Sequence, residues 1–279
     1  MVLVGSGCLA TTPAPPPFPG LGGTITPYTG SDCKTVLVAG DSLAAQLGES
    51  LKDELATSGR CADVVNDAVA GTSVGDWAPG GVDDLGHFLD TVHPDLVVIH
   101  FIGNEGTAGP QWDDPNYIAD AAADATQIIN EAKSRGIPIY WVLPPIAAWN
   151  CDFTQQSALR FVEWEHWVAS TASGLTGEPL VDWHLPFGGD HYSAAFTFPS
   201  GVQVVRAPDC VHFDFTPGNG QVIAADATVL AIEDQWTESG STSATGPVAP
   251  PGPSATGTTA PTTTTSSGPP TSTSTSSPR

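Results

Sequence analysis

The chain has 279 residues, enough for one large domain or two small ones. Its charge is strongly unbalanced: 30 acidic residues stand against 8 Lys and Arg, and the formal net charge is -22. Phosphate backbones and anionic lipid headgroups repel such a chain, which disfavours nucleic-acid binding and electrostatic attachment to membranes. No apolar stretch approaches the ~20 residues of a membrane-spanning helix, so we expect no transmembrane segment.

Both ends of the chain are low in sequence complexity, and they set the expected domain boundaries. Residues 237–279 consist almost wholly of Thr, Ser, Pro, Gly and Ala, and cannot bury enough apolar surface to offset the entropy of ordering. We predict a disordered tail there, either plain or an O-glycosylated extracellular stalk. Residues 1–30 are interpreted as a linker or the remnant of a signal, which leaves a folded domain over 31–236.

Short apolar runs alternate with helical patterns inside this domain. In chain order, strands are predicted at 35–39, 62–66, 96–102, 137–143 and 178–183. Helices are predicted over 43–59, 116–135 (with Asp114 and Pro115 as N-cap and first residue), 154–173 and 219–236, and a hairpin around Pro199-Ser200-Gly201. Continuous apolar strands alternating with helices indicate an α/β fold with a five-stranded parallel sheet covered on both faces.

Ligands of such a sheet bind outside the carboxyl ends of the strands, so the residues just after each strand are the candidates for a site. Ser42 follows the first strand and begins a helix, where free backbone N–H groups favour a developing oxyanion. Serine is a weak nucleophile without an adjacent base. His212 can be that base, and Asp209, three residues earlier, can orient its imidazole.

A tetrahedral intermediate at Ser42 would also need hydrogen-bond donors. The backbone N–H groups of Ser42 and Gly71 and the side-chain amide of Asn104 follow the first, second and third strands, respectively. Each donor of this kind lowers the barrier by about 3 kcal/mol.

Four sequence blocks, taken in chain order, resemble those of the SGNH hydrolases of the GDSL esterase/lipase superfamily: VAGDSLA, NDAVAGTS, FIGNEG and RAPDCVHF. The resemblance covers the folded domain and implies a flavodoxin-like three-layer α/β/α sandwich. It implies Ser42 as nucleophile, His212 with Asp209 as base and orienting residue, and Ser42, Gly71 and Asn104 as the oxyanion hole.

Three departures from the family pattern concern loop geometry more than the triad. In the third block, Gly103 directly precedes Asn104 and Glu105 replaces an Asp. In the fourth, Cys210 stands where the family usually has Gly. Two extra residues, Asp214 and Phe215, precede the Thr-Pro that normally follows the histidine more closely.

The expected function is a serine esterase that removes acetyl or other short acyl groups from a small-molecule or glycan ester through an acyl-enzyme. Two alternatives stay open. One is an O-acyltransferase that passes the acyl group to a hydroxyl of a cell-wall or extracellular polysaccharide. The other is a non-catalytic surface module that binds polysaccharide. No cofactor is expected, and no His/Asp spacing typical of a metal site occurs.

Several aromatic and histidine side chains near the expected site have two interpretations. Three tryptophans in loops after the strands either form a substrate rim or anchor those loops on the core: Trp77, Trp112 and Trp149. His100 is expected to pack or hydrogen-bond near the site. Alternative acid–base pairs are His184 with Asp182 and His191 with Asp190. Of these, His191 is interpreted rather as a loop residue at the rim of the site.

The cysteines bear on the compartment and on two disulfides. Cys33 precedes the first strand and Cys61 the second, which predicts a bridge between neighbouring strands. Cys151 follows the fourth strand and Cys210 lies in the His loop, so a second bridge would clamp that loop. Reduced thiols in a cytosolic enzyme are the alternative; the tail and the low Lys count favour a secreted or cell-surface protein. Cys8 is either a lipid anchor or incidental.

Overall fold

The structure is a computed structural model that describes residues 24–101, 104, 116–145, 155–189, 195–198, 201–214 and 220–236. Of 155–160, 196–198 and 201–204 it describes the backbone alone. All described residues belong to one compact unit within 1–239. The expectations for Cys8, for the N-terminal linker through residue 23 and for the tail 237–279 lie outside the described residues.

A five-stranded parallel sheet forms the centre of the unit, in the order β2-β1-β3-β4-β5. Its strands are β1 (Cys33–Gly40), β2 (Cys61–Asn66), β3 (Leu96–His100), β4 (Ile139–Leu143) and β5 (Val181–Asp182). The predicted fold class is confirmed. The fifth strand is shorter than predicted, because only two of its residues pair with β4.

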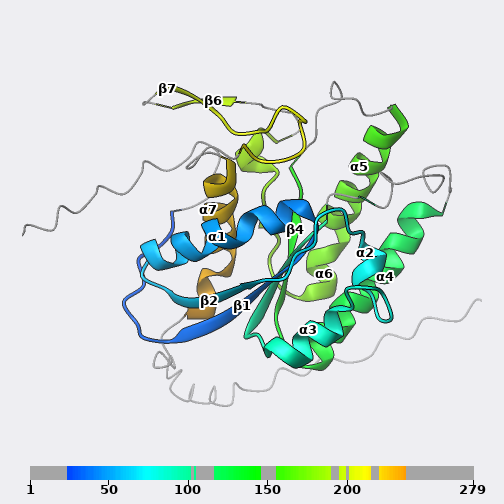
Figure 1. The fold of residues 1–279 in the computed structure, drawn as a ribbon, viewed down its shortest axis with the longest axis horizontal. Helices are drawn as coiled ribbons and strands as arrows, with labels where there is room; N and C mark the ends of the chain where they lie inside the picture. Colours follow the sequence, from blue (N-terminus) through cyan, green and yellow to red (C-terminus); the bar gives the residue numbers. More distant parts are fainter. Residues whose placement is uncertain are drawn as a thin grey trace, which may run out of the picture. The chain divides into compact units, whose positions relative to one another are not determined.

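Helices cover both faces of the sheet (Figure 1), which makes the unit a three-layer α/β/α sandwich. One face carries α1 (Ser42–Thr57) and α7 (Gly220–Ile232). The other carries α2 (Val74–Trp77), α3 (Leu85–Val92), α4 (Tyr117–Ser134), α5 (Gln155–Trp167), a π-helical turn (Val168–Ala172) and α6 (Ser173–Thr176). Short 3₁₀ turns follow β5 (Leu185–Phe187) and α7 (Glu233–Trp236).

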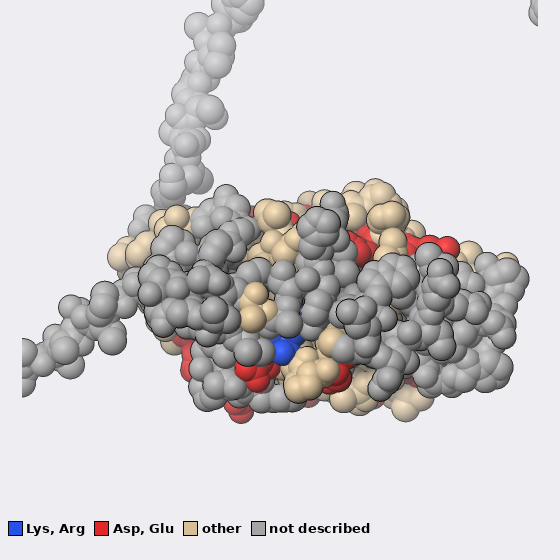
Figure 2. Space-filling view, turned by 90° about the horizontal axis from the view of Figure 1, so that it is seen from above, with Lys and Arg blue, Asp and Glu red and all other residues tan. Residues whose placement is uncertain are grey.

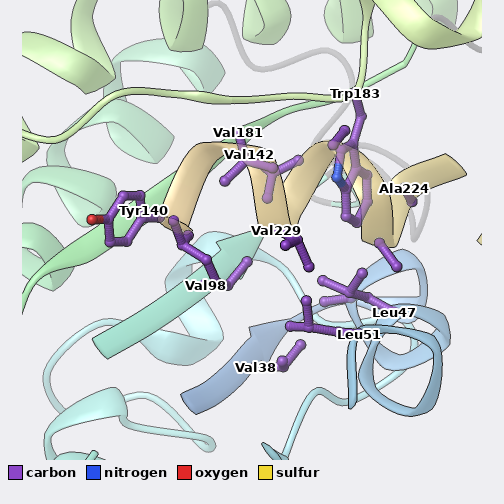
Figure 3. Packing of buried hydrophobic residues seen from close by; sticks show 14 of the residues in the cluster. Val38, Leu47, Leu51, Val98, Tyr140, Val142, Val181, Trp183, Ala224 and Val229 are labelled. Atoms are coloured by element: carbon purple, nitrogen blue, oxygen red, sulfur yellow. The ribbon is translucent and has the colours of Figure 1, made fainter. Parts of the chain in front are cut away.

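The alternating strand residues divide the core into two halves. Val36 and Val38 of β1 pack toward α1 and α7, whereas Leu37 and Ala39 pack toward α2, α3 and α4. Figure 3 shows the first half, where Leu47 of α1 meets the strands and α7. The leucine stripe predicted for the first helix is fully buried. The burial of each such leucine contributes about 1.5–3 kcal/mol to folding. The strands are covered by helices on both faces, so their residues are apolar on both faces.

Two features outside the sandwich also follow the sequence. The predicted hairpin forms from β6 (Ala195–Phe198) and β7 (Gly201–Val204), which pair antiparallel. Cys33 and Cys61 are register partners in β1 and β2, and they form the predicted disulfide with a Cα–Cα distance of 4.5 Å. No described helix is long and apolar enough to cross a membrane.

The structure corrects the predicted start of the helix over 116–135. Helix α4 begins at Tyr117 with Asn116 at the N-cap position, not with Asp114 and Pro115, which lie outside the described residues. The short helix α2 has no periodic signal in four residues; it is set by Ser73 and Asp76, whose side chains and backbones cap each other.

Candidate active site

Ser42 begins α1 immediately beyond the carboxyl end of β1. The turn depends on Gly40, whose φ is +117° and where a Cβ atom would overlap the carbonyl oxygen of His100. Asp41 is the N-cap of α1, and its Oδ1 accepts a hydrogen bond of 3.0 Å from the backbone N–H of Leu43. A tight glycine turn and a capped helix therefore fix the position of Ser42.

Ser42, His212 and Asp209 form one hydrogen-bonded row. The Nε2 atom of His212 lies 2.8 Å from the Oγ of Ser42, and its Nδ1 lies 2.7 Å from Oδ2 of Asp209. Ser42 and His212 are 170 residues apart in the sequence, so the fold brings them together. This is the arrangement in which an imidazole can take the hydroxyl proton while a carboxylate orients the ring.

The carboxylate of Asp209 is held by backbone donors as well. Its Oδ1 accepts hydrogen bonds of 3.0 Å from the N–H groups of Val211 and His212. Partial burial is the largest single influence on its pKa and raises it. The hydrogen bonds from Val211 and from the ring and backbone of His212, together with the attraction of that ring, outweigh burial and hold the pKa below its ordinary value. Asp209 is therefore an anion throughout the neutral range.

Asn104 lies between the ends of three strands. Its Nδ2 donates to the carbonyl oxygen of Thr72 at 3.1 Å and lies 3.5 Å from Oδ2 of Asp41. Gly71, next to Thr72, has a φ of +85°, and a Cβ atom there would meet no described atom within 4 Å. The hydrogen bonds of Asn104 thus tie the segment after β3 to those that follow β1 and β2.

His100 packs and hydrogen-bonds near the site as expected, and its partner is Asp41, the residue before Ser42, which the sequence did not single out. Nδ1 of His100 lies 2.9 Å from Oδ1 of Asp41, and both side chains are buried. The ring of His100 stacks on Trp183 with centroids 4.9 Å apart, and the indole N–H of Trp183 donates to Thr228 of α7. The one signal in the sequence was a histidine inside an otherwise apolar strand.

The other candidates are placed as follows. The substrate-rim interpretation of Trp77 is wrong. Its side chain is fully buried and donates its indole N–H to Thr72, so it anchors this segment on the core. His184 faces Glu165 at 3.0 Å, while Asp182 accepts from the backbone of Leu185; the predicted pair of His184 with Asp182 is not formed. Four candidates lie outside the described residues: Trp112, Trp149, Asp190 and His191.

Cys210 is disulfide-bonded, and its partner lies outside the described residues, as does Cys151. Within the described part of the chain, no three His, Cys, Asp or Glu side chains lie close enough together to hold a metal ion. The face in Figure 2 shows more acidic than basic surface among its described residues, in line with the net charge of -22.

Two solved structures share this fold. An acetyl xylan esterase superposes with a TM-score of 0.52 at 15% identity, over 71% of this chain and 99% of its own. A protein from Desulfitobacterium hafniense DCB-2 assigned to the G-D-S-L lipolytic family superposes with a TM-score of 0.51 at 12% identity, over 71% and 99%. These two likenesses show a shared fold.

A family model places the chain more narrowly. Residues 35–229 match the model described as "Protein of unknown function (DUF459)", and the chain belongs to that family. No curated protein is similar enough in sequence to count as a relative. The matched segment begins in β1 and ends in α7, so it includes every described residue of the site.

Proposed function

We propose that the protein is a serine esterase that cleaves carboxylic esters through an acyl-enzyme on Ser42. The observation that carries this proposal is the continuous row of short contacts, 2.8 Å from Ser42 to His212 and 2.7 Å from His212 to Asp209. The esterase fold of the structural neighbours supports the proposal as analogy only.

In the first half of the reaction, the Oγ of Ser42 attacks the ester carbonyl carbon while Nε2 of His212 takes the hydroxyl proton. The backbone N–H groups of Ser42 and Gly71 and the amide of Asn104 donate to the oxyanion that forms. The intermediate then collapses: the bond to the alcohol oxygen breaks, and the imidazolium returns its proton to that oxygen. Asp209 stabilises the imidazolium and keeps Nδ1 protonated.

In the second half, water replaces the alcohol. His212 takes a proton from the water as its oxygen attacks the acyl carbon, and the same donors stabilise the second oxyanion. Collapse releases the carboxylic acid, and His212 returns the proton to Ser42. An acyltransferase would differ only in the acceptor, because a sugar hydroxyl would replace the water.

The substrate class that we propose is a short acyl ester, with acetylated glycans as the first candidates. The acetyl xylan esterase among the structural neighbours motivates the choice of test substrate. We also propose that the protein acts outside the cytosol, since the Cys33–Cys61 disulfide persists in oxidising compartments.

The test is an ester panel with short and long acyl chains, acetylated xylan and acetylated cell-wall glycan, run with wild type and with Ser42→Ala. The variant should lose about 10⁴- to 10⁶-fold in kcat and keep the thermal midpoint of wild type. Partition between free acid and acylated sugar separates hydrolase from transferase. Glycan binding without acyl release in wild type would instead support a non-catalytic module and contradict the proposal.

A further inference from the structure

Cys210 has an unusual backbone conformation for a residue with a side chain. Its φ is +63°, in the left-handed region that glycine adopts at no steric cost. Among the described residues, His93 is the other non-glycine residue with a positive φ, and it is the C-cap of α3, where this conformation is ordinary. Cys210 belongs to no helix end; it lies between Asp209 and His212.

In this conformation the backbone N–H groups that follow Cys210 point toward the carboxylate of Asp209. The N–H of Cys210 donates to the carbonyl oxygen of Ala207 at 3.0 Å, which closes a turn. Because the chain then reverses at Cys210, the next two N–H groups, of Val211 and His212, point back at Oδ1 of Asp209. Successive N–H groups after a left-handed residue form an anion-binding concavity of this kind. The other oxygen of Asp209 is thereby left to face the imidazole.

The base of the loop is fixed to the core, but its tip is not. Arg206 and Phe213 form an antiparallel bridge, and the N–H of Ala207 donates to the carbonyl oxygen of His212 at 2.8 Å. The guanidinium of Arg206 is buried against the ring of Phe213. At the tip, the side chain of Asp209 is 52% exposed. Among the described residues, Asp209 is held by its bonds to Val211 and His212, and the guanidinium of Arg206 lies 3.5 Å from the carbonyl oxygen of Cys210.

The sulfur of Cys210 supplies such a hold, because it is disulfide-bonded. We propose that Cys210 is a positioning residue: its disulfide maintains the left-handed turn that aims Asp209 at His212. The cross-link thus holds the left-handed conformation that a glycine would adopt at no steric cost. The inference rests on the proposed function for the role of His212, whereas the turn and the contacts of Asp209 stand apart from it.

Three substitutions separate the turn from the cross-link: Cys210→Gly, Cys210→Ala and Cys210→Ser. All three remove the disulfide, but only glycine adopts the left-handed conformation freely. In the Ala and Ser variants kcat should fall about 5- to 30-fold, the factor that corresponds to the cost of a left-handed L-residue. KM should change little, because Cys210 would act through Asp209 and His212 on the chemical step. Cys210→Gly should rescue kcat to within about threefold of wild type.

A second readout does not depend on any substrate. The proton shared between Nδ1 of His212 and Asp209 should give a downfield resonance in the proton NMR spectrum, assigned by its loss in His212→Ala. We expect this resonance in wild type and in Cys210→Gly, and its broadening or loss in Cys210→Ala and Cys210→Ser. Thermal midpoints confirm that each variant is folded before the comparison is made.

The outcomes are distinguishable. Equal kcat and equal spectra for the Gly and Ala variants would overturn the proposal, as would a Cys210→Ala variant indistinguishable from wild type, or a free thiol at Cys210 in a non-reducing peptide map. A wild type that cleaves no ester contradicts the proposed function instead. In that case the NMR series alone decides whether Cys210 positions Asp209.

Discussion

The two sides of the proposed triad are built in different ways. On the nucleophile side, Asp41 and His100 are buried, and they connect the turn of Ser42 to Trp183 in the core. On the base side, the side chain of His212 is 31% exposed and that of Asp209 is 52% exposed, and both belong to a loop held by bonds within itself. The first side is part of the buried core, whereas the described residues of the second side are partly exposed to solvent.

The difference predicts how each side responds to substitution. A buried polar group that loses its partner costs several kcal/mol of folding free energy, because neither water nor another residue replaces that partner. An exposed group that loses a partner is solvated instead. Substitutions of the buried pair Asp41 and His100 should therefore reduce stability and activity together, whereas those of Asp209 and His212 should reduce activity alone.

The largest effect is expected on the base side. His212→Ala should lower kcat about 10⁴- to 10⁶-fold, and adding Ser42→Ala should cost little more, because residues that act as a unit are not additive. The thermal midpoint should stay close to that of wild type. Steady-state kinetics of the two single variants and the double variant, with calorimetry, check both statements. Independent, multiplying losses would mean that the two side chains do not share one proton transfer.

On the nucleophile side, His100→Phe tests the buried pair. The carboxylate of Asp41 would lose its imidazole partner in a buried site, so we expect a loss of about 3–5 kcal/mol in the free energy of unfolding, together with reduced kcat. His100→Gln keeps a side-chain donor and should lose less of both. Urea unfolding measures the free energies. Should His212→Ala destabilise the protein as much as His100→Phe, the contrast between the two sides would not hold.

Asn104→Ala tests the proposed oxyanion hole. Its amide is needed as charge develops on the oxyanion, so kcat should fall about 10²- to 10³-fold with little change in KM. The amide also donates to Thr72, so a small fall in the thermal midpoint is expected. A raised KM at constant kcat would instead make Asn104 a ground-state binding residue.

The strands and the site blocks could be predicted from the sequence because their signals are local. An apolar run such as 35–39 indicates a strand buried on both faces, and the position of Ser42 after it follows from the topology of parallel sheets. Cys33 and Cys61 became register partners for the same reason. Because the carboxyl ends of parallel strands lie at one edge of the sheet, the predicted strand ends also indicate the edge at which the candidate site lies.

What could not be predicted depends on contacts between distant segments. Asp41 and His100 are 59 residues apart, and nothing near either residue shows that their side chains meet behind Ser42. Trp77 could be a rim or an anchor until its burial and its bond to Thr72 were seen. The left-handed turn at Cys210 had one hint, the glycine that the resembled family usually has there, but a cysteine at that position does not by itself predict a positive φ.

A last contact joins α1, which begins at Ser42, to α7. Glu54 of α1 and Asp226 of α7 are hydrogen-bonded to each other between packed helices, and Asp226 is buried. Burial, then the charge of Glu54 and the hydrogen bond, raise the pKa of Asp226 to about 7; burial also raises the pKa of Glu54. Two carboxyl groups in contact share one proton, because both cannot ionise there without repulsion.

The smallest predicted effect follows from the sign of these shifts. The folded state binds the proton more tightly than the unfolded state, so the stabilisation is complete below the ordinary carboxyl pKa of ~4 and is lost as pH rises through about 7. In Asp226→Asn the amide mimics the neutral carboxyl group and donates to Glu54 at every pH. The variant should match wild type at acid pH and melt roughly 4–8 °C higher at alkaline pH, the shift that ~2 kcal/mol produces in a domain of this size.

Asp53→Asn is the matched control. It also removes one negative charge, but from an exposed residue that lies next to Glu54 on α1. General relief of the net charge of -22 would raise the midpoint in both variants alike and would argue against a shared proton. A rise confined to Asp226→Asn, with kcat unchanged, would locate the effect in the contact between α1 and α7. Because α1 begins at Ser42 and α7 packs against it, that result would show that the shared proton stabilises the scaffold beside Ser42 without entering the chemistry.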